Sequence, residues 1–480
     1  MISEEKEKTN YVLRDAKLEF KKILKKYVLQ FFSGKCTIKI YDNKTSNKVD
    51  ALICKADKVN YNVYPTTGKP AFFARVKNAD ISDNDRKLAN TILLELSYVN
   101  EFNCVRGNVY KRYNYDARYF VTYNDKISGK VKKVEKNIYK DKRYKTAFEV
   151  GISKWLGGVT IDKLIDELSR WSTRTYEGNK VPFGFLVNIK NDKTKYNMEG
   201  LIDFIEYLST DTSGALFTDG MSSGLKLDYQ GKVINYFTVK KQFLDKKPYT
   251  PISYSGFASM CREDEYKNNW VGIVLMKNGT IMIIKNQELI LTKKNNKWYF
   301  VKSHLMKEII FNFIKNSSAL TDRSNINKMA EKLALLILDI SYLRKGGCIG
   351  IVTDEMKNTL TDKYCNNDYL KNQNTKFKHL FIKSVTNYDE HKFLDIDRNL
   401  LQDLLSMDGA LVMDANGSLI CAGAIIKVDG GSDEGGRTAA AKQLGKFGLG
   451  IKISEDGNFS FYKKNVKNKV GYELVYESLK

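Results

Sequence analysis

The sequence is poor in proline, in histidine and in paired cysteines. It has 5 prolines and 3 histidines in 480 residues, and this argues against long proline-rich linkers. The 7 cysteines are scattered, and no two of them have the Cys-x-x-Cys spacing. Zinc-finger spacing is therefore excluded, and nothing indicates a disulfide framework. Free thiols are typical of a reducing compartment, so we expect a cytoplasmic protein.

Long apolar runs are lacking as well. The first ten residues, MISEEKEKTN, are polar and charged, unlike a secretory signal. The longest apolar runs, such as Leu333–Leu338, are far shorter than the roughly 20 residues that cross a bilayer. We expect a soluble protein that does not act at a membrane.

The composition is that of a globular, strongly basic chain. Hydrophobic residues make up 42% of the sequence, enough for sizeable cores, and its length suggests two or three domains. The formal net charge of +23 favours anionic partners such as nucleotides, nucleic acid or acidic lipid. Abundant Lys, Asn, Ile and Tyr would also follow from a compositional bias of the genome, so both explanations of the charge stay open.

The first 320 residues indicate two α+β regions. Apolar spacing over residues 9–32 predicts a long amphipathic helix, and residues 1–145 form the first region. Its basic stretch, 126–145, is either a solvated linker or a nucleic-acid contact. Residues 146–320 form a second region, where three hairpins are predicted between Leu225 and Val301. Neither region shows a catalytic constellation.

Residues 324–480 predict an α/β domain with a mixed central sheet flanked by helices. The expected order is helix, strand, helix, strand, strand, glycine-rich loop, helix, strand, strand. Residues 355–379 are polar and are expected to be a surface insertion. The second helix, over residues 394–405, has Asp395 or Asp397 near its start. The whole chain is therefore predicted to be a multidomain α+β protein.

Two features of this last domain suit nucleotide chemistry. Glycines in loop 429–438 let backbone amides approach an anion, and the following helix adds its positive end, with Arg437 at the junction. Asp408, next to Gly409, lies where a helix meets a strand and can bind a divalent metal that also holds phosphates. The simpler interpretation is a turn followed by a flexible connector.

Three motifs in residues 324–463 resemble those of the diadenylate cyclase (DAC) domain family. They are Asp408-Gly409-Ala410, the segment Gly435-Gly436-Arg437-Thr438-Ala439-Ala440-Ala441, and Ser454-Glu455. The family's Arg-His-Arg triplet keeps only its first arginine, Arg437, because Thr438 and Ala439 replace the other two. Met407 also stands where the family often has histidine. The region 170–301 is similar, more loosely, to the sensor-like DACNV region of a divergent branch.

The resemblance implies a cyclase that condenses two ATP molecules into cyclic di-AMP and releases pyrophosphate. Family domains act face to face, so at least a homodimer is implied, regulated here by the N-terminal region. Asp408 would hold Mg²⁺ or Mn²⁺, and Glu455 would assist the metal or the attacking hydroxyl. Nucleotide contacts would come from Gly409, Ala410, Gly435, Gly436, Arg437 and Thr438. Lys427 or Lys442 could replace the missing arginine.

Two alternatives remain open. The lost charge beside Arg437 fits a module that binds nucleotide without turnover. The basic stretch 126–145 and the net charge fit a nucleic-acid-binding protein, whose binding would depend steeply on salt.

Overall fold

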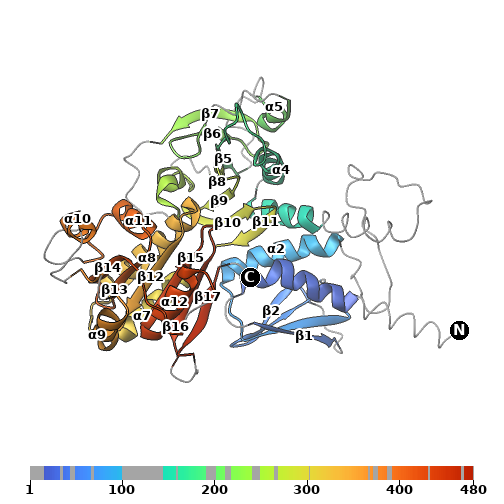
Figure 1. The fold of residues 1–480 in the computed structure, drawn as a ribbon. Helices are drawn as coiled ribbons and strands as arrows, with labels where there is room; N and C mark the ends of the chain where they lie inside the picture. Colours follow the sequence, from blue (N-terminus) through green and yellow to red (C-terminus); the bar gives the residue numbers. More distant parts are fainter. Residues whose placement is uncertain are drawn as a thin grey trace, which may run out of the picture. The chain divides into compact units, whose positions relative to one another are not determined.

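The architecture is taken from a computed structural model of the chain (Figure 1). It describes residues 16–32, 36–43, 49–65, 67, 70–99, 144–157, 160–190, 202–210, 218–239, 249–263, 269–301, 303–365, 368–370, 377–385, 392–430, 433–465 and 470–478. The basic stretch 126–145 lies almost wholly outside these ranges. Among the described residues, no helix is long and apolar enough to cross a membrane.

The chain divides into two compact units that do not follow simple chain order. Unit 1 comprises Met1–Val239, Met260–Asn286 and Leu291–Phe300, and unit 2 comprises Lys240–Ser259, Gln287–Ile290 and Val301–Lys480. Unit 1 thus takes in residues on both sides of position 145, while residues 240–259, 287–290 and 301–320 of the predicted second region belong to unit 2. The described residues form a mixed α and β structure with three sheets.

Unit 1 begins with helical turns and a small antiparallel sheet. Residues 16–31 are helical and end in a π-turn, η1 (Leu24–Val28), and a 3₁₀ turn, η2 (Leu29–Phe31). The sheet has the order β1-β4-β3-β2, and helix α2 (Asp83–Val99) follows it. Its strands are β1 (Thr37–Asp42), β2 (Ile53–Asp57), β3 (Asn60–Val63) and β4 (Phe72–Lys77).

A second sheet of seven strands has the order β11-β10-β9-β8-β5-β6-β7. Strands β5 and β6 are parallel, and the pairs β10–β11, β8–β9, β5–β8 and β6–β7 are antiparallel. The three predicted hairpins are confirmed in it. Its strands are β5 (Phe183–Asn188), β6 (Ser223–Leu227), β7 (Val233–Thr238), β8 (Trp270–Leu275), β9 (Ile281–Lys285), β10 (Glu288–Lys294) and β11 (Lys297–Phe300). Its helices are 144–156, α4 (Ile161–Trp171) and α5 (Phe204–Thr210). Segment 240–259 lies between β7 and β8 in the sequence but belongs to unit 2. It carries η6 (Ile252–Tyr254) and α6 (Ser255–Ser259).

Unit 2 is built on a mixed six-stranded sheet of order β14-β13-β12-β15-β16-β17. Strands β12 and β13 are parallel, and every other pair is antiparallel. The strands are β12 (Gly347–Val352), β13 (Ala410–Asp414), β14 (Leu419–Ala424), β15 (Gly448–Ile453), β16 (Phe459–Lys464) and β17 (Tyr472–Glu477). This is the mixed central sheet that the sequence predicts.

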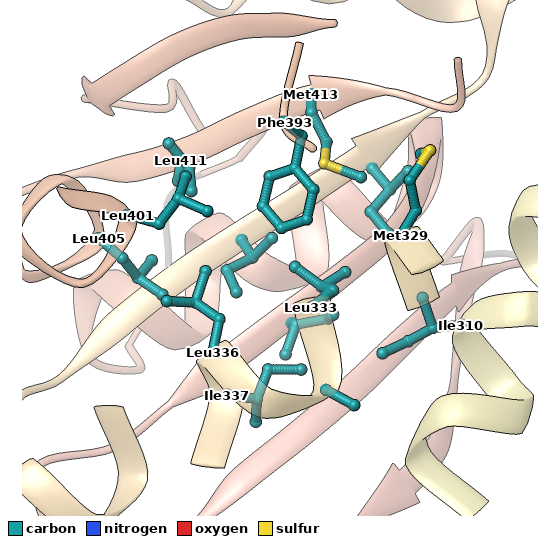
Figure 2. Close-up of a cluster of buried hydrophobic side chains, with 14 of the residues drawn as sticks. Ile310, Met329, Leu333, Leu336, Ile337, Phe393, Leu401, Leu405, Leu411 and Met413 are labelled. Carbon is teal, nitrogen blue, oxygen red and sulfur yellow. The ribbon is translucent and has the colours of Figure 1, made fainter. Parts of the chain in front are cut away.

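Helices cover both faces of this sheet. Alternate strand residues, such as Ile349 and Leu411, pack with α7 (Ser303–Ser317), α8 (Arg323–Leu343) and α11 (Arg398–Ser406). Figure 2 shows side chains from α8, α11 and β13 in this cluster. The residues between them, such as Cys348 and Val412, pack with α9 (Asp354–Lys363) and α12 (Gly436–Phe447). Two buried faces account for the almost wholly apolar central strands.

One buried ion pair fixes α11 against α8. The Asp339 carboxylate is 1% exposed and accepts hydrogen bonds from Arg398 Nε at 2.6 Å and from Gln402 Nε2 at 2.9 Å. It also accepts the backbone N–H of Ile252 at 2.7 Å, while Arg398 donates to the Thr250 carbonyl. Burial raises the pKa of Asp339, opposed by Arg398. Helix α11 is therefore held rigidly just before Asp408.

The expected surface insertion at 355–379 is wrong in part. Residues 354–363 form helix α9, whose Leu360 is fully buried, and Phe377–Val385 form α10. The mean hydropathy of α9 is low. Its single buried stripe is therefore not found by a search for apolar runs. Strand β17 is also absent from the order predicted for residues 324–480.

Candidate functional site

One edge of the unit 2 sheet gathers the ends of three strands. Parallel strands β12 and β13 begin there, and β15, which pairs Ile453 with Gly347, ends there. Residue Asp408 comes two positions before β13, and Glu455 comes two positions after β15. Asp408 and Gly346 each stand three residues before the paired residues Leu411 and Ile349. Neighbouring strands lie about 4.8 Å apart, so the turns before β12 and β13 are adjacent.

Gly409 is required by the backbone at this edge. Its φ is +110°, and a Cβ atom there would lie 2.4 Å from the carbonyl carbon of Gly423. Ala410, the next residue, pairs with Ala424 at the end of β14. A residue with a side chain at position 409 would push β14 away from β13. The glycine thus sets the direction in which the chain leaves exposed Asp408 and enters the sheet.

The Arg437 guanidinium lies across the start of β12. A Cβ atom at Gly346 would lie 2.0 Å from Arg437 Nη1, so the guanidinium occupies the space that any side chain at 346 would take. On its other side, Arg437 Nη1 donates to Glu455 Oε1 at 2.7 Å, with the two side chains 41% and 71% exposed. Arg437 is therefore seated between β12 and the end of β15, at the edge that also carries Asp408.

The charge of Arg437 affects the pKa of the buried Cys348 thiol in β12. Burial raises the pKa of the Cys348 thiol to about 12, and Arg437 opposes that rise. Cys348 stays a neutral thiol beneath the guanidinium at neutral pH.

Helix α12 begins with open space above its first turn. A Cβ atom at Gly435 or Gly436 would meet nothing within 4 Å. The Thr438 N–H donates to the Gly435 carbonyl at 2.8 Å, and Ala439 is buried. The bare first turn leaves the positive end of the helix dipole accessible to an anion. Gly431 and Ser432 of the predicted loop lie outside the described residues.

The described part of the glycine-rich loop is tied to α12. The Asp429 carboxylate accepts from Gln443 at 2.9 Å, from Tyr364 at 3.0 Å and from Lys446 at 3.2 Å. These bonds, with that of Gln443 first, lower the pKa of Asp429. Lys442 pairs with Glu434 at 2.6 Å, so its ammonium is already engaged beside the loop. Lys427 is exposed in the loop after β14.

The site residues predicted from the sequence are thus brought to one edge, but they do not all touch. Arg437 and Glu455 are in direct contact. Gly409 directly precedes β13, which begins at Ala410. Gly435 is the N-cap of α12, and Gly436 and Thr438 lie in its first turn. Among the described residues, no hydrogen bond or ion pair involves the Asp408 side chain. Gly346 was not among the site residues predicted from the sequence. The signal was the Gly346-Gly347 pair before an apolar strand, because glycine there allows another group to lie close to the backbone.

The donors at this edge suit a hard cation shared with phosphates. Among the described residues, no group of three or more His, Cys, Asp or Glu side chains could hold a metal by itself. Mg²⁺ is usually held by one or two carboxylates together with substrate phosphates. Exposed Asp408, with Glu455 on the same edge, fits that arrangement, and carboxylate oxygens suit Mg²⁺ and Mn²⁺.

Comparisons with known proteins give matches among solved structures alone. No family model matches the chain, and no curated protein matches its sequence. Among solved structures, a double-cysteine variant of DacA from Staphylococcus aureus is 12% identical, covers 32% of this chain and 89% of its own, and has a TM-score of 0.20. A hypothetical membrane-spanning protein from Bacillus cereus is 15% identical, covers 33% and 86%, and has a TM-score of 0.17. Similarity this low carries no argument about function.

Proposed function

We propose that unit 2 is a nucleotidyltransferase that condenses two ATP molecules into cyclic di-AMP. The observation that carries the proposal is the seating of Arg437 between Gly346 and Glu455, at the sheet edge where Asp408 precedes β13. The three motifs that resemble the diadenylate cyclase domain are far apart in the sequence, and all lie at this edge. A cation and two carboxylates beside a helix N-terminus are among the groups that bind a nucleoside triphosphate with its metal.

The reaction asks the protein mainly for positioning and charge neutralisation. Each ribose 3′-oxygen bonds to the α-phosphorus of the other ATP, and the bond from that phosphorus to the bridging oxygen of the β-phosphate breaks. The hydroxyl proton goes to a nearby carboxylate or to solvent, and pyrophosphate leaves. Asp408 would hold Mg²⁺ or Mn²⁺, which supplies charge neutralisation at the phosphates. Arg437 and the amides at Gly435 and Gly436 would hold the triphosphate.

In this proposal Glu455 has two roles at different stages. Without nucleotide it holds the Arg437 guanidinium over Gly346. When phosphate oxygens reach Arg437, they compete with Glu455 for the same Nη1 donor. The released carboxylate would then be able to assist the metal or the attacking hydroxyl.

The proposal extends to partners and control. Each unit would bind one ATP, so a working site needs two copies of the chain face to face. The N-terminal region would regulate the cyclase, as the looser sensor-like resemblance suggests. Product formation that rises with the square of protein concentration at high dilution would support the dimer.

The test is product formation by the purified full chain. With ATP and Mn²⁺ we expect cyclic di-AMP by mass spectrometry. Asp408→Asn, which keeps the shape and removes the charge, should lower the rate about 100-fold or more. Glu355→Gln is the matched control, because exposed Glu355 starts α9 after the opposite end of β12. Equal rates for Asp408→Asn and wild type would remove Asp408 from the mechanism.

A second candidate is a module that binds ATP or a cyclic dinucleotide without turnover. It is favoured by the Arg437–Glu455 ion pair, which neutralises the motif's remaining arginine, and by burial of Ala439 where the family has a cation. Calorimetric binding of nucleotide, without product in Mg²⁺, Mn²⁺ or Co²⁺, would decide for this candidate.

A further inference from the structure

The motif at the start of α12 brings too little positive charge for a triphosphate. Arg437 is followed by Thr438 and by buried Ala439, so the first turn carries one guanidinium. Glu455 neutralises that guanidinium in part, at 2.7 Å. Lys442, one turn further on, is paired with Glu434. A triphosphate at this edge therefore needs a cation from another element.

The turn between α8 and β12 reaches the same edge. Helix α8 ends at Arg344, whose φ is +53° and whose N–H donates to the Ile340 carbonyl. This left-handed residue stops the helix and turns the chain toward the sheet. Exposed Lys345 follows, and then come buried Gly346 and Gly347. The turn thus brings Lys345 next to the residue on which the Arg437 guanidinium rests.

Lys345 has the properties of an available cation. Its backbone N–H donates to the Ile340 carbonyl at 3.3 Å, which fixes the base of the side chain. Its ammonium pairs with no carboxylate among the residues that the structure describes. A lysine ammonium on a flexible four-carbon stem binds phosphate as a point charge and needs no fixed geometry.

We propose that the turn Lys345-Gly346 is the second phosphate-binding element of the site, with the polyphosphate tail of a nucleoside triphosphate as its ligand. Gly346 provides the bare surface that seats Arg437, and Lys345 supplies the second positive charge. This inference rests on the proposed nucleotide site, but it does not depend on whether the site turns ATP over. It explains how a single motif arginine can suffice.

Binding of α,β-methylene-ATP to the full chain with Mg²⁺, measured by calorimetry over a series of KCl concentrations, tests the proposal. Lys345→Met should weaken binding about tenfold and make the salt dependence shallower, because one charge contact is lost. Lys345→Arg should stay within about threefold of wild type, since it keeps the charge. Lys463→Met is the control. Lys463 pairs with Leu449 near the start of β15, at the opposite end of the strands from the site.

Gly346→Ala adds an independent arm. Position 346 does not have a left-handed backbone, and the three atoms nearest to an added methyl group all belong to the Arg437 guanidinium, so alanine there should displace that group. Affinity should again fall about tenfold. Melting curves by circular dichroism check folding, and if this variant does not fold, the lysine pair still decides. If the wild type binds and Lys345→Met binds with the same affinity and salt dependence, this inference is overturned while the nucleotide site stands. Absence of binding by wild type overturns the inference together with the nucleotide site.

Discussion

At the scale of single residues, two glycines of unit 2 have opposite requirements. Gly409 has a left-handed φ, and a Cβ there would overlap the backbone of Gly423. Gly436 opens α12 with empty space around it. We therefore expect Gly409→Ala to lower the free energy of unfolding by about 3 kcal/mol. Gly436→Ala should raise it by about 0.5 kcal/mol, because alanine favours the helix.

Urea denaturation of both glycine variants measures this difference. Two equal and small changes would mean that β14 does not pack against Gly409 as described. A loss of solubility in the Gly409 variant alone would agree with the structure, since an unpaired β14 would expose an apolar edge.

Individual site residues could be predicted only where a motif carried them. The motifs named Asp408, Arg437 and Glu455, and the structure places all three at one edge. The seat of Arg437 could not be predicted, because it depends on the register between β12 and β15 and on where α12 crosses them. Equally, nothing in the sequence showed that Lys442 would pair with Glu434.

At the scale of elements, the start of α11 is fixed by one carboxylate. Of the two candidates, Asp397 is the N-cap, and its side chain accepts the Asn399 N–H at 2.8 Å. Asp397→Ala should cost about 1 kcal/mol of stability at pH 7. Asp395→Ala, which removes an exposed carboxylate two residues earlier, should cost less than about 0.5 kcal/mol and is the matched control.

The stabilisation by Asp397 should also depend on pH. The Asn399 N–H lowers the pKa of Asp397, so the folded state favours the carboxylate form. Its contribution is present above the unfolded pKa of about 3.9 and is lost as pH falls through the lower folded value. Urea denaturation at pH 7 and near pH 3 measures this. The difference in free energy of unfolding between wild type and Asp397→Ala should become smaller in acid. A gap that widens in acid would contradict the cap.

Elements with strong periodicity were predictable, and those stabilised by tertiary contacts were not. Helices α4, α8 and α12 and the hairpin of β8 and β9 follow their apolar patterns and turn signals. Helix α9 is polar over most of its length, and its Leu360 packs in the same buried cluster as Ala441 and Leu444 of α12. Strand β17 is an edge strand with half-exposed residues, so its alternation is weak.

At the scale of the whole molecule, the chain enters unit 2 before unit 1 is complete. Segment 240–259 lies between β7 and β8 in the sequence but belongs to unit 2, where Asp339 accepts the Ile252 N–H. A destabilised unit 2 should therefore release this segment together with α8. Leu333→Ala provides the test, because it opens a cavity in the hydrophobic core of unit 2 and should lower the free energy of unfolding by about 2–5 kcal/mol.

Hydrogen exchange followed by mass spectrometry is the measurement. In Leu333→Ala, peptides from 249–259 and from α8 should exchange faster, while peptides from β8 and β9 should keep their wild-type rates. Ile273→Ala, which opens a cavity in the seven-stranded sheet, should give the reverse pattern. If 249–259 follows β8 in both variants, the division into two units is wrong.

The interleaved path has a consequence for the order of folding during synthesis. The amide of Ile252 is bonded to a carboxylate 87 positions further along the chain. When β7 leaves the ribosome, the helix that will hold the next segment has not been made. That segment must wait, for several seconds at about 5–20 residues per second, while β8 and β9 emerge behind it. Unit 1 has its last residues at Phe300 and can be completed while the segment waits, whereas unit 2 cannot be completed until α8 and the strands after it have been made.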